Sequence, residues 1–158
     1  MQAVIICGGT GSRLKAFIGN KAKALVKFKG AENLKNQISL LKKNGIKNFL
    51  FLTNHFEDQI KYFLKKNYSE KFIFHKDKNY FGTGGCLYDA KNKLEKKFLI
   101  VFSDLYFDFN FKNFIKNTIK KKCIFSCVVH ANDHPHDSDT VLLDKNFYIK
   151  NIYKKNNK

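Results

Sequence analysis

The first residues of the chain join a short apolar run to a glycine-rich turn. Ala3-Val4-Ile5-Ile6-Cys7 is continuously apolar, and the run stops at Gly8-Gly9-Thr10-Gly11. Apolar runs without alternation are typical of strands buried on both faces, as in parallel sheets. The sequence therefore predicts an α/β fold whose first strand leads into a glycine-rich loop.

Predicted strands and helices alternate along the rest of the chain. Apolar residues at helical spacing predict helices over 32–43, 56–66, 86–94 and 111–119. Apolar runs predict strands over 49–52, 72–74, 98–102, 124–129 and 141–143. This order is typical of a mostly parallel sheet with helices on both faces, a three-layer α/β/α fold that binds ligands at the carboxyl ends of its strands. The sequence contains no repeat and no linker, so residues 1–158 are expected to form one domain.

The net charge of +17 raises the question of nucleic-acid binding. Arg13 is the only arginine, and the lysines are spread along the whole sequence. Proteins that read base edges usually use arginine, because its planar guanidinium binds two acceptors at once. We therefore interpret the charge as a solvated surface and expect no nucleic-acid partner. A basic nucleic-acid-binding protein is the weakest of the alternatives.

Several features predict a cytoplasmic protein without a membrane partner. No apolar stretch approaches the roughly 20 residues of a spanning helix. The first residues lack the basic flank of a signal peptide. The four cysteines Cys7, Cys86, Cys123 and Cys127 follow no disulfide-scaffold spacing, so we expect reduced thiols.

The loop after the first strand is a candidate phosphate-binding site. Glycine has no Cβ, so the backbone N–H groups of such a loop can approach a triphosphate closely. Arg13 and, further along, Lys23 could neutralise the phosphates. The loop has neither the Walker spacing nor the dinucleotide spacing, which argues against those two classes. A tight turn that binds nothing is the alternative for the glycines alone.

This motif resembles the signature of the sugar-1-phosphate nucleotidyltransferases, the family of the mannose-1-phosphate and heptose-1-phosphate guanylyltransferases. It reads Gly8-Gly9-Thr10-Gly11-Ser12-Arg13-Leu14 and is followed by Lys23-Ala24-Leu25-Val26. The resemblance implies a Rossmann-like nucleotidyltransferase fold and an enzyme that joins an NTP to a sugar 1-phosphate, giving an NDP-sugar and pyrophosphate. It also implies that the glycine-rich loop and Arg13 hold the NTP phosphates, and that Lys23 contacts phosphate at the reacting centre.

An acidic residue follows the most apolar run of the chain. Ser103-Asp104 comes directly after residues 98–102 and resembles the family's Gly-Asp pair, in which the aspartate binds the catalytic Mg²⁺. One carboxylate with phosphates and waters is a usual Mg²⁺ site. Asp104 is therefore the expected metal ligand and a catalytic residue. A turn aspartate that only ends the strand is the alternative.

A second glycine-rich segment, Gly82-Thr83-Gly84-Gly85, resembles the family segment whose backbone lies against the nucleobase. A helix start capped by Thr83 is the alternative. Asp77 stands where some relatives carry a base-reading side chain. Its carboxylate could accept hydrogen bonds from N1–H and N2–H₂ of guanine, so GTP is the favoured NTP. A solvated aspartate is the alternative.

The segment 130–139 holds three of the five histidines and the only proline. It resembles a stretch of nucleotidyltransferases that are fused to, or work with, phosphatases of heptose activation. The resemblance implies a phosphatase partner and sugar binding by Asp137, Ser138 and Asp139. A zinc site with Cys123 and Cys127 is the alternative, although these residues follow no standard zinc spacing.

The chain departs from the family pattern at two positions and in its length. Ala22 stands where a proline usually precedes the lysine, and Ser103 stands where glycine is usual. Family members continue well beyond this length, as if the chain lacked the C-terminal part. A non-catalytic nucleotide- or phosphosugar-binding remnant is therefore the main alternative to an enzyme. A homo-oligomer remains open.

Overall fold

The molecule is described by a computed structural model that covers residues 1–77, 82–131 and 138–155, with the backbone alone at Arg13. The chain divides into two compact units, Met1–Asn113 and Phe114–Lys158. The expectation of one domain over residues 1–158 stays a prediction.

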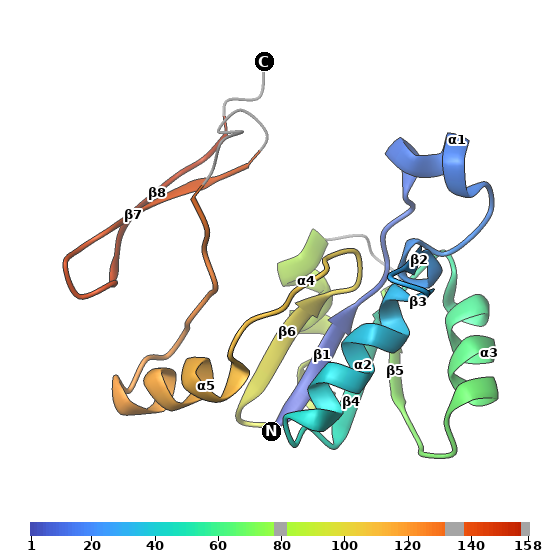
Figure 1. Cartoon of the computed structure of the whole chain (residues 1–158), viewed down its shortest axis with the longest axis horizontal. Helices are drawn as coiled ribbons and strands as arrows, with labels where there is room; N and C mark the ends of the chain where they lie inside the picture. Colours follow the sequence, from blue (N-terminus) through green and yellow to red (C-terminus); the bar gives the residue numbers. More distant parts are fainter. Residues whose placement is uncertain (78–81, 132–137, 156–158) are drawn as a thin grey trace. The chain divides into compact units, whose positions relative to one another are not determined.

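Four parallel strands form the sheet of the first unit, in the order β5-β4-β1-β6 (Figure 1). Their bounds are Gln2–Ile6 for β1, Asn48–Thr53 for β4, Ile73–Lys76 for β5 and Phe98–Phe102 for β6. Strand β1 is central, so that Ile5 lies between Phe51 of β4 and Val101 of β6. The predicted parallel sheet is confirmed.

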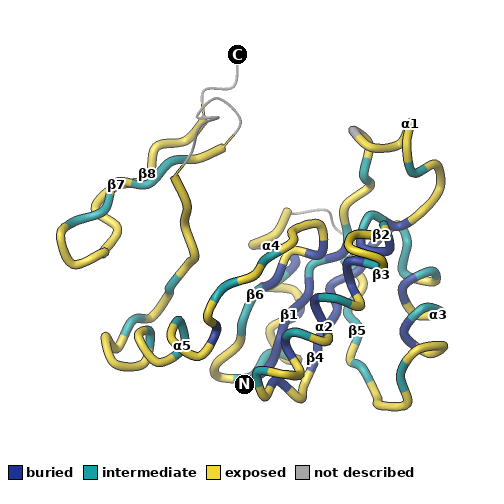
Figure 2. The backbone as a smooth tube through the Cα atoms, in the orientation of Figure 1, coloured by how far each residue is buried: buried dark blue, intermediate teal, exposed yellow. Residues whose placement is uncertain are grey.

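Helices cover both faces of this sheet. Helices α2 (Asn33–Lys43) and α3 (Glu57–Asn67) pack on the face that carries Ile5. Helix α4 (Gly82–Asp89) packs on the face that carries Val4. Neighbouring residues of a strand point to opposite faces, so β1 serves both layers. Figure 2 shows the buried residues gathered in the central strands and along α2 and α3. The three-layer α/β/α prediction is confirmed.

Helix α2 illustrates how the sequence sets these elements. Leu34, Ile38 and Leu41 recur at helical spacing and are fully buried. After the helix, Gly45 adopts a φ of 84°, and its N–H donates to the carbonyl oxygen of Lys42. This is the left-handed stop that glycine makes easily and that the Asn-Gly pair predicts.

Short elements between β1 and α2 shape the carboxyl edge of the sheet. They are η1 (Ser12–Leu14), α1 (Lys15–Ile18), η2 (Lys23–Leu25) and the hairpin of β2 (Lys27–Phe28) and β3 (Ala31–Glu32). Parallel strands end at the same edge, so the loops that follow β1, β4 and β6 meet there.

Within the described ranges, no helix is long and apolar enough to cross a membrane.

The second unit carries an antiparallel hairpin of β7 (Thr140–Leu143) and β8 (Ile149–Tyr153). Helix α5 (Phe111–Lys120) begins in the first unit and ends in the second. The strand predicted over 124–129 is wrong, because this run forms no strand and its Ile124 and Phe125 are exposed. A strand needs a pairing partner, and no described residue supplies one here, so apolar and β-branched composition alone does not produce it.

Candidate functional site

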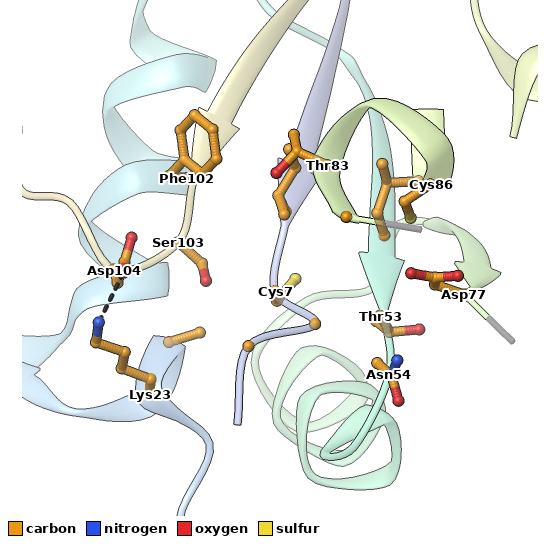
Figure 3. Close-up of a pocket in the computed structure, with 16 residues that line it drawn as sticks. Cys7, Lys23, Thr53, Asn54, Asp77, Thr83, Cys86, Phe102, Ser103 and Asp104 are labelled. Carbon is orange, nitrogen blue, oxygen red and sulfur yellow. Dashed lines mark hydrogen bonds and ion pairs between the residues drawn. The ribbon is translucent and has the colours of Figure 1, made fainter. Parts of the chain in front are cut away.

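A cavity of about 350 Å³ opens at the carboxyl edge of the parallel sheet in the first unit (Figure 3). Its size falls in the range of small-ligand pockets, roughly 300–1,000 Å³. The ends of β1, β4 and β6, the helix η2 and the start of α4 form its walls. The cavity therefore lies where an α/β sheet is expected to bind its ligand.

Residues from separate sequence motifs meet in this cavity. The predicted site residues in its lining are Gly8, Gly9, Lys23, Asp77, Gly82, Thr83 and Asp104. Those of the same motifs that lie outside the lining are Thr10, Gly11, Ser12 and Gly84. The side chain of Arg13 lies outside the described part of the structure, so its role stays a prediction. Ser138 and Asp139 belong to the second unit, and Asp137 lies outside the described residues. The structure thus gathers the phosphate, base and metal motifs of the prediction, whereas the sugar-binding residues stay a prediction.

Lys23 and Asp104 form an ion pair in the cavity lining. Lys23 Nζ donates to Asp104 Oδ2 at 2.7 Å (Figure 3). Their side chains are 31% and 38% exposed, so a ligand can reach both. The Ser103-Asp104 pair follows β6 directly, as predicted. Ser103 before it has no left-handed φ, so the replacement of the family's glycine by serine creates no backbone strain.

Gln59 of α3 fixes the backbone just before Lys23. Its Oε1 accepts a hydrogen bond from the Ala22 N–H at 2.8 Å, and its Nε2 donates to the carbonyl oxygen of Asn20 at 2.7 Å. Ala22 has a φ of −58° and a ψ of 129°, which are angles that proline also adopts. The loop therefore keeps a proline-like conformation, and Gln59 binds the N–H that a proline would lack.

Different structural constraints act on the three glycines that follow β1. A Cβ on Gly8 would lie 3.2 Å from the Cβ of Asn54, which is tighter than ordinary contact. Gly11 has a φ of 66°, which residues with a side chain rarely adopt. A Cβ on Gly9 would meet nothing within 4 Å, and the φ of Gly9 is not left-handed. The fold thus favours glycine at position 8 through close packing and at position 11 through its φ, whereas neither constraint acts at position 9.

The second glycine-rich segment is the first turn of α4. The helix runs over Gly82–Asp89 instead of the predicted 86–94, and a short η3 (Lys91–Lys93) follows it. Thr83 lies inside the first turn, so the cap that the alternative assigned to it is wrong. Packing overrides the weak helix propensity of glycine here, because Cys86 and Ala90 are buried against the sheet.

Two buried thiols contribute a neutral part of the lining. Cys7 follows β1 and Cys86 lies on α4, and each is 6% exposed. Burial raises the pKa of the Cys86 thiol to about 11 and raises the pKa of Cys7 further. Both thiols are uncharged at neutral pH, so the charged groups of the lining are Lys23, Asp77 and Asp104.

Thr53 and Asn54 also line the cavity, although the sequence motifs do not single them out. They are 0% and 7% exposed. Both stand at the carboxyl end of β4, just as Asp104 stands after β6. The rule that ligands bind at the carboxyl ends of parallel strands could therefore have predicted them as site residues. The Asn54 side chain makes no hydrogen bond to the described residues, which leaves its amide available to a ligand.

Metal-ligating side chains are not clustered in the part of the chain that the structure describes. Across these residues, no three His, Cys, Asp or Glu side chains are grouped so that they could hold an ion. Cys123 and Cys127 are free thiols, and His134 and His136 lie outside the described residues. The zinc alternative therefore gains no support here, and Asp104 is the acidic group that stands next to a predicted phosphate-binding lysine.

Curated relatives match a large part of this chain. It is 35% identical over 121 residues to the bifunctional IPC transferase and DIPP synthase of Aquifex aeolicus, a match of 76% of this chain and 28% of the relative. It is 28% identical over 121 residues to the D-glycero-alpha-D-manno-heptose 1-phosphate guanylyltransferase of Campylobacter jejuni, a match of 76% of this chain and 55% of the relative. In each case the match takes in 55% of the relative's length or less.

Solved structures share the fold. The crystal structure of HddC from Yersinia pseudotuberculosis has a TM-score of 0.75 at 23% identity, and the match covers 98% of this chain and 69% of that one. At this identity the likeness shows the α/β fold alone. The family model described as nucleotidyl transferase matches residues 2–155. Because this match runs along nearly the whole sequence, the chain belongs to the nucleotidyl transferase family.

Proposed function

We propose that the chain is the nucleotide-binding part of a sugar-1-phosphate nucleotidyltransferase, which makes an NDP-sugar and pyrophosphate from an NTP and a sugar 1-phosphate. The observation that carries the proposal is the meeting of Lys23 and Asp104 in a ligand-sized cavity beside Gly8 and Gly9. A cation, an acid and open backbone N–H groups are the parts that triphosphate binding needs.

In the proposed reaction, a phosphate oxygen of the sugar 1-phosphate attacks the α-phosphorus of the NTP. A new P–O bond forms as the bond to the β-phosphate oxygen breaks, and pyrophosphate leaves with that electron pair. The protein contributes positioning and charge neutralisation. Lys23 supplies positive charge at the reacting phosphate, and the resemblance assigns a similar role to Arg13. The glycine-rich loop, Gly8 to Ser12, holds the triphosphate through its backbone.

Asp104 has the chemistry of a Mg²⁺ ligand. One of its carboxylate oxygens accepts from Lys23, and the other has no partner in the described part of the chain. The side chain is 38% exposed, so an ion with its waters can reach it. One carboxylate completed by phosphate and water oxygens suits Mg²⁺. When bound, the ion would neutralise negative charge on the triphosphate.

Asp77 and Asn54 support guanine as the base. They follow the neighbouring strands β5 and β4 directly, and the Asp77 N–H donates to the carbonyl oxygen of Thr53 at 2.9 Å. A carboxylate accepts from N1–H and N2–H₂ of guanine, and a carboxamide can donate to its O6. Gly82 and Thr83 would offer the backbone on the other side of the base. GTP is therefore the proposed NTP.

The sugar is proposed from a relative and the family resemblance, and the protein partners are proposed from the sequence alone. The Campylobacter jejuni relative is a heptose 1-phosphate guanylyltransferase, which favours a heptose 1-phosphate as the substrate. The family resemblance adds mannose 1-phosphate as the second candidate. Asp137, Ser138 and Asp139 are the proposed ligands of the sugar hydroxyls. A phosphatase of the same pathway and a second copy of the chain are the proposed protein partners. The cytoplasm is the proposed location of the reaction.

Product analysis tests this function. The purified chain is incubated with Mg²⁺, one of four NTPs and either mannose or heptose 1-phosphate, and nucleotide sugars are identified by mass spectrometry. Phosphocholine and inositol 1-phosphate serve as alcohol phosphates outside the sugar class. A GDP-sugar as the main product is expected. CDP-choline or CDP-inositol would contradict the substrate class, and GTP binding without any product would favour the binding-only alternative.

A further inference from the structure

The loop that carries Asp104 is held by buried amide side chains of α2. Asn33 Nδ2 donates to the carbonyl oxygen of Ser103 at 2.9 Å and to that of Leu105 at 3.1 Å. These carbonyls lie on either side of Asp104, so the two bonds bracket it. Asn33 is 7% exposed, and its contacts are shielded from water.

Gln37, one turn further along α2, makes a parallel set of contacts. Its Nε2 donates to the carbonyl oxygen of Phe102 at 2.9 Å and to that of Leu105 at 2.6 Å. Gln37 is 3% exposed. Carbonyl oxygens cannot donate, so both side chains must turn their NH₂ groups toward the loop. Four hydrogen bonds from one helix therefore converge on the backbone around Asp104.

Helix α2 and the loop that carries Asp104 are each anchored to the rest of the first unit. The neighbouring Leu34 and Ile38 of α2 are fully buried in the core, which fixes the helix. The loop itself stays tied to the sheet, because the Ser103 N–H donates to the carbonyl oxygen of Ile6 at 3.0 Å. The Asp104 carboxylate is then free to rotate only about its own side-chain bonds, opposite Lys23.

The acceptor halves of the two amides show that donation is their role. Asn33 Oδ1 and Gln37 Oε1 are buried and accept no hydrogen bond from the described residues. A buried polar atom without a partner is unfavourable. An apolar side chain would fill this space at a lower free-energy cost. The presence of amides at these two buried positions is therefore explained by their hydrogen bonds to the loop and not by packing.

We propose that Asn33 and Gln37 are positioning residues for the reaction: they fix the backbone of Asp104 so that its carboxylate meets the metal-bound nucleotide in one orientation. This inference rests on the proposed function. Groups that orient a metal ligand typically change metal affinity or activity about 10- to 100-fold when they are removed. A purely structural role predicts a loss of stability without that change.

The test uses Asn33→Leu and Gln37→Met, which keep the approximate length of each side chain and remove the donors. Asn36→Leu is the matched control, because Asn36 Nδ2 on the same helix donates at 2.8 Å to the carbonyl oxygen of Phe28 in β2 and not to the backbone on either side of Asp104. Turnover, the Mg²⁺ concentration for half-maximal rate, the KM for the NTP and the thermal midpoint are measured for each. The two variants are made separately, so that either one serves if the other fails to fold.

For folded Asn33→Leu or Gln37→Met, a fall in turnover and a rise in the half-saturating Mg²⁺ of about tenfold or more are expected. The KM for the NTP and the Asn36→Leu control should stay near the wild-type values. Unchanged Mg²⁺ dependence in a folded variant, or an equal change in Asn36→Leu, would overturn the proposal while leaving the enzyme function in place.

If the wild-type chain shows no turnover, the proposed function fails first, and Mn²⁺ binding in the presence of GTP replaces the rate as readout. Weaker Mn²⁺ binding by the two variants than by Asn36→Leu then supports positioning. Equal binding by all four proteins contradicts it.

Discussion

The Nζ atom of Lys23 lies 2.7 Å from Oδ2 of Asp104, although 81 positions separate the two residues in the chain. The lysine comes from η2, and the aspartate comes from the loop after β6. The pair therefore links η2 to the loop after β6 at one edge of the sheet. In the proposed reaction, both charges act on the same triphosphate. The ion pair therefore keeps the Lys23 and Asp104 side chains close to each other at the proposed triphosphate site.

Lys23→Met should reduce turnover by about 100- to 1,000-fold, because a fixed positive charge at the reacting phosphate is lost. The thermal midpoint should hardly change, since a partly exposed ion pair contributes only about 0–1 kcal/mol. Steady-state kinetics and thermal melts check this. Lys21→Met, two residues away and exposed, is the control. Equal activity of Lys23→Met and the control would exclude Lys23 from the reaction.

Gly8→Ala and Gly9→Ala should fail in different ways. The Gly8 variant crowds Asn54 and should lose about 1–3 kcal/mol of unfolding free energy through overpacking. The Gly9 variant has room, so its unfolding free energy should stay the same or rise by up to about 1 kcal/mol. Its new methyl group should lower GTP affinity about tenfold or more by blocking a charge-assisted backbone contact. Chemical denaturation and calorimetry measure both. Wild-type GTP affinity in the Gly9 variant would mean that the phosphates do not approach there.

Gln59→Ala should loosen the loop before Lys23 and reduce turnover about 10- to 100-fold, because small misplacements of a reacting group have effects of that size. Adding Ala22→Pro should recover part of the loss. Proline fixes φ near the observed −58° and needs no N–H partner. In the wild-type background the same change removes the Gln59 hydrogen bond and should bring no gain. A double variant no better than Gln59→Ala would disprove this account of the loop.

Asp77→Asn should weaken GTP binding about 10- to 100-fold, because a carboxylate that accepts hydrogen bonds from guanine is replaced by an amide that accepts less well. ATP binding should change little. Competition titrations with both nucleotides check the ratio. Asp58→Asn, an exposed acid of α3, is the control for net charge. Equal losses for GTP and ATP would remove Asp77 from base recognition.

Local patterns in the sequence predict the sheet and the ends of its strands. The run before Gly8 is β1, and the run before Ser103 is β6, so both loops reach the same edge. Once the strands are parallel, their carboxyl ends must gather, so the glycine-rich loop and Asp104 could be predicted at one edge of the sheet. The expectation that Lys23 joins them comes from the resemblance to the family signature, because Lys23 lies in η2 and not at a strand end. The Asn44-Gly45 stop of α2 follows from a backbone preference of two residues.

Other features depend on contacts that no local pattern contains. The amides Asn33, Gln37 and Gln59 look like ordinary polar residues of amphipathic helices, and only the tertiary fold shows that they hold the site loops. The early start of α4 depends on packing of Cys86 against the sheet. The run over 124–129 has strand composition, but composition does not supply a pairing partner.

Pyrophosphate release by the wild-type chain and by Asp104→Asn, measured side by side with GTP, mannose or heptose 1-phosphate and Mg²⁺, tests the central claim most directly. We predict release by the wild-type chain only when all three components are present, and none above background for the variant, whose thermal midpoint should match the wild type. Release by Asp104→Asn at the wild-type rate, or release that needs no sugar 1-phosphate, would contradict it.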